Sequence, residues 1–296
     1  MKNIENKYPW LKIYSGSIEK YIQPDYYNRL LKEYNFSKKS DIDYFNSFLK
    51  HTCCKNMENV LELGAGAGRG TDVFIDSIMK FKQLDIVDLS EDMVQQIKNK
   101  YDKNKKICIY RSDNIEYIKE TKKKYDLVYS LWSFSHSIHQ HLIDKHKKSA
   151  YIEEIIKKFI QNNMRSGASF FLIHFDSLSE EQKILMRQYR KFFPLFKSKI
   201  KQSPSKLILD EVLNFFDGKK IKNLTVNHLE GDPIVYDSME SALEIFMNLH
   251  METEFNRHNN VQEIIDELKE DIEKYKKDDG KYYIKPGCFI YTFEKV

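Results

Sequence analysis

The sequence predicts an α/β fold built on a mainly parallel sheet with helices on both faces. Three observations support this prediction. Between residues 58 and 175, short apolar strands alternate with amphipathic helices, a pattern typical of βαβ units. A glycine-rich turn, Gly64–Gly70, joins the first strand to the first helix. An acidic residue, Asp88, ends the second strand, so both features fall at the edge where open parallel sheets bind ligands.

Five strands are predicted in this region. Each is a short run that is rich in β-branched, aromatic or other apolar residues. The strands cover residues 58–66, 84–90, 106–113, 125–132 and 169–175. Amphipathic helices are predicted between them. The clearest lies over about 144–163, where Ile152, Ile156 and Phe159 share one face.

Outside this region the chain is predicted to contain a cap and a lid. We divide it into an N-terminal helical cap at 1–50, a ligand-binding core at 51–176, a helical insertion at 177–222 and a C-terminal part at 223–296. The insertion follows the fifth strand and is charged and aromatic, so we expect it to cover a substrate and exclude water. The C-terminal part returns to the sheet, because its segment 224–229 and the closing CFIYTFEKV have the pattern of strands.

The composition limits the possible functions. The 296 residues carry a net charge of +4, without the clustered positive charge of a dedicated nucleic-acid binder. The four cysteines include no CxxC pair, which favours free thiols in a reducing compartment. We find neither a signal segment nor a run of about 18 apolar residues. The sequence therefore predicts a soluble cytoplasmic protein with no membrane partner, and it carries no indication of oligomeric state.

The segment VLELGAGAGRG is the most informative part of the sequence. Gly64, Gly66 and Gly68 recur at every second position, and glycine both adopts positive φ and lets a ligand approach the backbone. A dinucleotide site usually has the spacing GxGxxG. Glu62 would also repel a pyrophosphate, whereas it would attract a cationic amino-acid group. Together with Asp88, which can accept hydrogen bonds from ribose hydroxyls, the turn predicts an adenosine-containing cofactor.

These residues resemble motif I of the class I S-adenosylmethionine-dependent methyltransferases, in which a hydrophobic strand with an acid leads into G-x-G-x-G. The segments VDLSEDM, RSDN and YDLVYS resemble the later motifs of that family in the same order. The resemblance covers about residues 56–175 and implies S-adenosylmethionine as the cofactor. It also implies a Rossmann-like, seven-stranded sheet whose last strand is antiparallel and lies between the fifth and sixth.

The resemblance also assigns expected roles to single residues. Asp88 would bind the ribose hydroxyls, Asp113 would face the adenine amino group, and Ser130 would approach the methionine part through its backbone. The complete predicted cofactor-binding set is Glu62, Leu63, Gly64, Ala65, Gly66, Gly68, Asp88, Leu89, Met93, Asp113, Asn114, Ser130 and Leu131.

Missing motifs narrow the choice of methyl acceptor. No (D/N/S)PP(Y/F) segment follows the fourth strand, as it does in enzymes that methylate the amino groups of adenine or cytosine. No Pro-Cys pair for cytosine-C5 chemistry occurs either. Ser130 stands where Mg²⁺-dependent O-methyltransferases have an acid, so no metal is predicted. We expect a small-molecule or peptide acceptor, preferably an amine nitrogen, and the C-terminal layout is loosely similar to that of histamine N-methyltransferase.

The stretch SLWSFSHSIHQHL places three histidines in a predicted loop after the fourth strand. We predict that His136 is the base or orienting group on the acceptor side, because an amine must lose a proton to react. His139 and His141 are expected at the rim or in solvent, pointing different ways. The predicted acceptor-binding residues are Tyr14, Trp132, His136, His139 and Phe175.

Three alternatives remain open from the sequence. A metal-free O-methyltransferase would use the same site with an oxygen acceptor. An RNA or protein methyltransferase would need a basic recognition surface, for which the lysines between 197 and 206 are candidates. A binding module without catalysis is disfavoured, because Glu62, Asp88 and Asp113 are all present.

Overall fold

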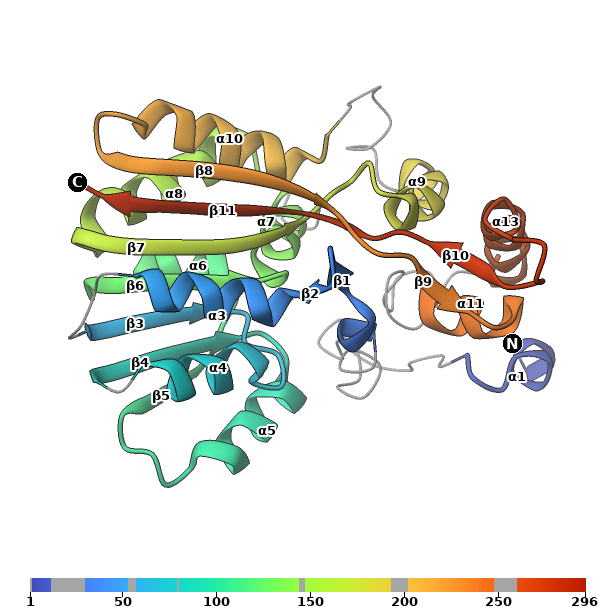
Figure 1. Ribbon diagram of the computed structural model, residues 1–296, viewed down its shortest axis with the longest axis horizontal. Coiled ribbons are helices and arrows are strands. Elements are labelled where there is room, and N and C mark those ends of the chain that lie inside the picture. Colours follow the sequence, from blue (N-terminus) through green and yellow to red (C-terminus); the bar gives the residue numbers. More distant parts are fainter. Residues whose placement is uncertain are drawn as a thin grey trace. The chain divides into compact units, whose positions relative to one another are not determined.

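The computed structural model describes residues 2–11, 30–52, 57–78, 80–143, 147–192, 202–247 and 260–296. The chain forms two compact units, each assembled from separate segments. One unit contains 1–38, 177–198 and 230–287, and the other contains 39–176, 199–229 and 288–296. The second unit holds the central sheet (Figure 1). The predicted division into a cap, a core, a lid and a C-terminal part remains a prediction.

The central sheet has seven strands in the order β5-β4-β3-β6-β7-β11-β8. Strands β3 to β7 pair in parallel, and β11 pairs antiparallel with β7. The α/β class is therefore confirmed, and so is the place of the last strand between the fifth and sixth. The strands are β3 (Met57–Leu63), β4 (Phe81–Asp88), β5 (Ile107–Arg111), β6 (Tyr125–Leu131), β7 (Met164–Phe175), β8 (Ile221–Glu230) and β11 (Gly287–Lys295).

Helices cover both faces of this sheet. In Figure 1, α3 and α4 lie in front of the strands, whereas α6 and α8 lie behind them. The helices of this unit are α3 (Asp41–His51), α4 (Arg69–Ser77), α5 (Glu91–Tyr101), α6 (Asn114–Glu120), α7 (Ser133–Ile143), α8 (Ser149–Asn163) and α10 (Pro204–Phe216). The short strand β2 (Lys39–Ser40) precedes α3.

Helix α3 is fixed to the sheet by its first turn and by one aromatic side chain. Ser40 accepts a hydrogen bond from the Asp43 backbone while the Asp43 carboxylate accepts one from Ser40, which forms a capping box. Phe45 is fully buried, and its ring centroid lies 4.6 Å from that of Tyr129 and 5.1 Å from that of Phe171. These contacts hold the start of α3 over the carboxyl half of the sheet.

The other unit is built from helices and a small two-stranded sheet. Its elements are α1 (Lys2–Lys7), β1 (Asn35–Phe36), α9 (Glu180–Phe192), β9 (Ile234–Tyr236), α11 (Met239–Ile245), α13 (Val261–Glu273) and β10 (Tyr282–Ile284). Strands β9 and β10 pair antiparallel. Arg187 of α9 bonds to Glu270 of α13 at 2.7 Å.

Along the described stretches of both units, no helix combines the length and apolar character needed to cross a membrane.

The segment after β6 differs from its prediction. It is not a loop, because α7 begins at Ser133, two residues after β6 ends. Phe134, Ile138 and Leu142 recur at four-residue spacing and are all buried, so an apolar stripe anchors this helix. The predicted loop was therefore wrong, and the histidines lie on successive turns of a helix.

Candidate functional site

The glycine turn lies at the carboxyl end of β3, between its neighbours β4 and β6. Gly64, Gly66 and Gly68 have φ values of +72°, +56° and +87°, a left-handed conformation that other residues adopt at a cost. The Gly64 amide donates to the Val87 carbonyl at 2.7 Å. Because the chain order of the strands reverses here, this edge is the expected ligand crevice of an open parallel sheet.

Gly64 also meets the beginning of α7. A Cβ atom added to Gly64 would lie 1.9 Å from Ser133 Oγ and 2.1 Å from Ser133 Cβ. Asn114 Nδ2 donates to the same Ser133 hydroxyl at 3.2 Å. The turn, α6 and α7 therefore meet around Ser133, which the sequence did not identify as a site residue.

Glu62 lies beneath the turn on β3. Its side chain is buried, and Oε2 accepts hydrogen bonds from Thr71 Oγ1 at 2.5 Å and Tyr129 Oη at 3.0 Å. Burial raises the pKa of Glu62 to about 8, because an ionised carboxylate is poorly solvated there. A cationic group near the turn would favour the ionised form.

Asp88 ends β4 and faces the turn. Its Oδ2 accepts from the Gly66 amide at 2.8 Å, and its Oδ1 accepts from the Ser90 amide at 2.9 Å. Burial raises the pKa of Asp88 to about 6, although these backbone hydrogen bonds act in the other direction. Of the next predicted residues, Leu89 is exposed and Met93 is buried in α5.

Asp113 caps α6 and binds two side chains of α7. It accepts hydrogen bonds from the amides of Ile115 and Glu116, from Ser137 Oγ at 2.6 Å, and from His141 Nε2, which lies 2.8 Å away. Burial acts to raise its pKa, but the bonds from His141 and Ser137 hold that pKa below its usual value. His141 is fully buried, so the expectation that it lies at the rim or in solvent was wrong.

The ends of β3 and β6 are joined by a side chain. Ser130 Oγ donates to the Leu63 carbonyl at 2.7 Å. Both residues are buried, as are Ala65 and Leu131. The sequence predicted a role for the Ser130 backbone, and the structure adds that its hydroxyl fixes the strand end that leads into the turn.

Trp132, one of the predicted acceptor-binding residues, directly follows β6. It has φ +72° although it is not glycine, which is an uncommon and strained backbone conformation. Its ring centroid lies 4.7 Å from that of Phe175, and the His136 ring lies 5.2 Å from Phe175 at an interplanar angle of 78°. Three of the predicted acceptor-binding residues therefore lie together at the ends of β6 and β7. Tyr14 lies outside the described residues.

His139 faces a different group of residues. Its Nε2 accepts a 3.4 Å hydrogen bond from the Ser205 amide at the beginning of α10. Ser205 Oγ also lies 2.8 Å from Nε2 of the buried His174. Apolar surroundings lower the pKa of His139 to about 3 and that of His174 to about 4, so both rings are neutral near pH 7.

Two residues missed from the sequence form a pair next to Phe175. Asp176 directly follows β7 and is buried, and its Oδ2 lies 2.7 Å from His228 Nε2. The His228 ring stacks on Phe289 with centroids 4.7 Å apart. Asp176 could have been suspected, because it follows a predicted strand at the ligand-binding edge. His228 could not, since it comes from β8, far along the chain.

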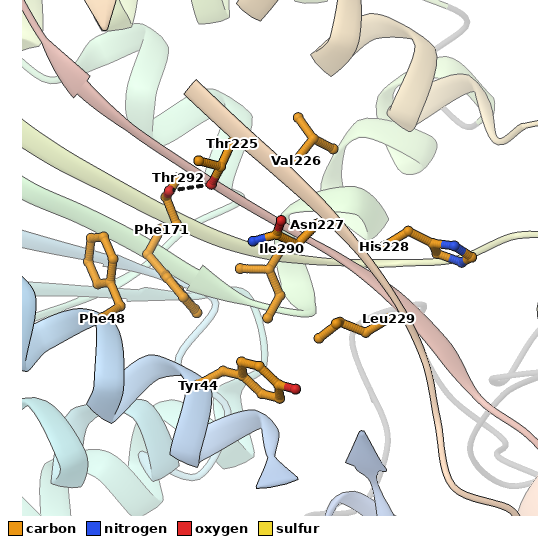
Figure 2. Close-up of a pocket in the computed structure, with 10 residues that line it drawn as sticks. All are labelled: Tyr44, Phe48, Phe171, Thr225, Val226, Asn227, His228, Leu229, Ile290 and Thr292. Carbon is orange, nitrogen blue, oxygen red and sulfur yellow. Dashed lines mark hydrogen bonds between the residues drawn. The ribbon is translucent and has the colours of Figure 1, made fainter. Parts of the chain in front are cut away.

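His228 also lines a hollow of about 400 Å³ on the sheet. Figure 2 shows this hollow between α3 and the strands β7, β11 and β8. Its lining is mixed, with apolar side chains such as Phe48, Phe171 and Ile290 beside polar ones such as Asn227 and His228. Thr225 of β8 and Thr292 of β11, both in its lining, hydrogen-bond to each other at 2.7 Å (Figure 2).

Comparison with known proteins identifies the family. A family model described as AdoMet dependent proline di-methyltransferase matches residues 19–199, which is more than half of the chain. The chain belongs to this S-adenosylmethionine-dependent methyltransferase family. The resemblance found in the motifs is therefore confirmed, and so are the enzyme class and the cofactor. No curated protein matches this methyltransferase.

Solved structures share the fold of the methyltransferase at low identity. A candidate methyltransferase from Bacillus halodurans is 12% identical, has a TM-score of 0.51, and is matched over 86% of this chain and 98% of its own. The YcgJ protein from Bacillus subtilis is 14% identical, with a TM-score of 0.50 and coverage of 85% and 98%. At these identities the similarity shows the fold alone.

The turn of the methyltransferase fits its cofactor. The three left-handed glycines leave the backbone without side chains, so a ligand can approach it closely. Asp88 lies against Gly66, where a carboxylate can accept hydrogen bonds from ribose hydroxyls. The predicted cofactor-binding set remains a prediction, and Asp113 already has both its oxygen atoms bonded to protein groups.

Proposed function

We propose that this methyltransferase transfers a methyl group to an amine nitrogen of a peptide or small molecule. The observation that carries the proposal is at the end of β7, where the His136 ring contacts Phe175 and the buried Asp176 follows Phe175 in the chain. An imidazole and a carboxylate suit an acceptor that arrives as an ammonium ion. The family description names proline, so a peptide with an N-terminal proline is the first acceptor to test.

The bound cofactor supplies a methyl group on a sulfonium sulfur, which is already activated for displacement. The protein has to align the acceptor nitrogen with that methyl group and remove the proton of the ammonium form. We assign proton removal to His136, which begins the second turn of α7. Trp132 and Phe175 offer aromatic faces that favour a cationic acceptor or product.

Asp176 supports an amine over an oxygen acceptor. Its buried carboxylate can pair with an ammonium group and with the positive charge that remains after methylation of a tertiary amine. A phenol acceptor would become an anion on deprotonation, and this carboxylate would then oppose it. The hollow lined by Tyr44 and Phe171 offers room for the chain of a larger acceptor.

The test is a transfer assay with S-adenosylmethionine labelled on its methyl group. The pools are peptides with N-terminal proline or alanine, small amines, phenols and RNA. We expect label in the amine pools, with proline peptides the strongest, and none in RNA. Transfer to phenols alone would favour the metal-free O-methyltransferase, and salt-sensitive transfer to RNA would favour the RNA alternative. Either result would overturn the proposal.

A further inference from the structure

Asp41 is the first residue of α3, and its carboxylate holds two separate elements of the site. Its side chain is buried, at 1% exposure. Oδ1 and Oδ2 accept hydrogen bonds from the Arg69 guanidinium at 2.8 and 3.1 Å. Oδ2 also accepts one from Trp132 Nε1 at 2.9 Å. A buried charge is retained only where it is paired and hydrogen-bonded in this way.

The bond to Arg69 fixes one end of the glycine turn. Arg69 is the first residue of α4 and directly follows Gly68, whose φ is +87°. Gly68 occupies the cap position of α4 and has no side chain to close the helix end. A guanidinium held by two parallel hydrogen bonds has a fixed direction as well as a fixed place. The start of α4 is therefore held from outside the turn.

The bond to Trp132 fixes the end of the glycine turn at Gly64. The left-handed backbone of Trp132 is held by its amide, which donates to the Ile173 carbonyl at 3.0 Å, and by its indole, which donates to Asp41. The next residue, Ser133, lies directly against Gly64. A relaxed Trp132 would shift Ser133, and Ser133 has no room to move toward the turn.

We propose that Asp41 is a positioning residue that keeps the turn from Gly64 to Gly68 in its cofactor-binding shape by holding both of its ends. Asp41 acts through Arg69 and Trp132. The same carboxylate links the cofactor side of the enzyme to Trp132, a predicted acceptor-binding residue. This proposal concerns cofactor binding, so it holds or fails independently of the acceptor.

The test measures the affinity of the full chain for S-adenosylhomocysteine by calorimetry, together with the thermal unfolding midpoint. The variant Asp41→Asn keeps the shape of the side chain and one carbonyl oxygen but loses the charge that orients Arg69. We expect its dissociation constant to rise about tenfold or more, as when an outer residue that orients a ligand-binding group is lost.

The matched control is Asp126→Asn. Asp126 accepts two hydrogen bonds from Arg165, at 3.1 and 2.9 Å, and two more from the amides of Glu58 and Asn59. It sits near the beginning of β6, at the opposite end of that strand from Trp132. We expect lower stability in this control and a dissociation constant within about twofold of the wild type. A folded Asp41→Asn protein that binds as tightly as this control would overturn the proposal.

A second variant decides the matter if Asp41→Asn does not fold. Trp132→Phe keeps an aromatic ring against Phe175 but loses the Nε1 donor and part of the buried indole. Its control is Trp10→Phe, which makes the same change and removes a bond to Glu240 in the other unit. We expect the dissociation constant of Trp132→Phe for S-adenosylhomocysteine to rise at least about threefold, which corresponds to the loss of one modest hydrogen bond. Equal affinity in the two phenylalanine variants would overturn the proposal.

Discussion

At Gly64 a single methyl group is enough to disturb the turn. Alanine at this position would have to keep φ +72° and would place its Cβ atom 2.1 Å from Ser133 Cβ. We expect Gly64→Ala to lose about 1–3 kcal/mol of unfolding free energy and to bind S-adenosylhomocysteine at least about tenfold more weakly, because the turn and α7 must separate. Calorimetry and urea unfolding measure the two effects.

The control for Gly64→Ala is Gly167→Ala. Gly167 has φ +80°, and no atom lies within 4 Å of an added Cβ. This variant carries the same left-handed strain without a clash and far from the turn, so it should lose some stability and keep its affinity. If both variants lost affinity equally, the clash with Ser133 would not be the cause.

Asp88 gives cofactor binding a dependence on pH. Its pKa of about 6 lies above the usual aspartate value of 3.8, so the folded state holds this proton more tightly than the unfolded state. Ionising Asp88 therefore lowers the unfolding free energy as the pH rises from about 4 to 6. The ionised form is the better acceptor for ribose hydroxyls, so affinity should rise through about pH 6 and level off above about pH 7.

Calorimetric titrations with S-adenosylhomocysteine at pH 5, 6, 7 and 8 measure this dependence. Asp88→Asn is the comparison, since it keeps the shape and cannot ionise. We expect weaker binding in the variant with little change between pH 5 and 7. A variant that retained the full slope of the wild type would assign the titration to another group.

His136 should affect turnover without affecting cofactor affinity. With an amine acceptor found in the transfer assay, we expect His136→Asn to lower kcat by about 100-fold, the usual contribution of a general base. The affinity for S-adenosylhomocysteine should stay unchanged. His51→Asn, at the exposed end of α3, is the control and should turn over normally. Unchanged turnover of His136→Asn across pH would exclude the role of His136 as base.

The residues of the turn were accessible from sequence because their signal is local. Glycines at alternate positions and an acid at the next strand end need only a short window. The pairs Asp41–Trp132 and Asp176–His228 could not be predicted from sequence, because each joins residues from elements far apart in the chain. Their geometry depends on the order of strands in the sheet, which no short pattern carries.

Helix α7 shows how an element can be missed while its signal is present. Serine and histidine dominate its sequence, and both are weak helix formers. The apolar stripe of Phe134, Ile138 and Leu142 is a helical signal, but the serines and histidines between these residues are more typical of a loop. Helix α8 was found because its apolar residues recur over more than two turns. For β7, the prediction missed the first residues, since Gly167 at φ +80° interrupts the strand pattern.

The attachment of α3 to the sheet gives a prediction at the level of an element. Phe45 packs on Tyr129 and Phe171 and is fully buried. Phe45→Ala should therefore lower the unfolding free energy by about 3–5 kcal/mol, the usual cost of emptying an aromatic site in a core. Phe215→Ala, an exposed position on α10, should cost less than about 1 kcal/mol. Urea unfolding compares them, and equal losses would contradict the packing described for α3.

For the whole molecule, the topology of the sheet followed from the sequence and the grouping into units did not. Alternating strands and helices predict a parallel sheet, and the family resemblance implies its seven strands with the antiparallel last strand between the fifth and sixth. Each unit draws on three separate segments, and residues 39–176 separate the first two segments of the unit without the central sheet. The change to a charged and aromatic segment after Asp176 falls at one of these borders, but the grouping of the segments depends on contacts between parts far apart in the chain, which no local pattern carries.

The central claim is that the chain binds S-adenosylmethionine at the turn from Gly64 to Gly68. Calorimetric titration of the full chain with S-adenosylhomocysteine tests it most directly. The account predicts one-to-one binding with a dissociation constant of about micromolar order, strongly weakened in Gly64→Ala and preserved in Gly167→Ala. Absence of binding at millimolar concentration, or equal binding by both glycine variants, would contradict it.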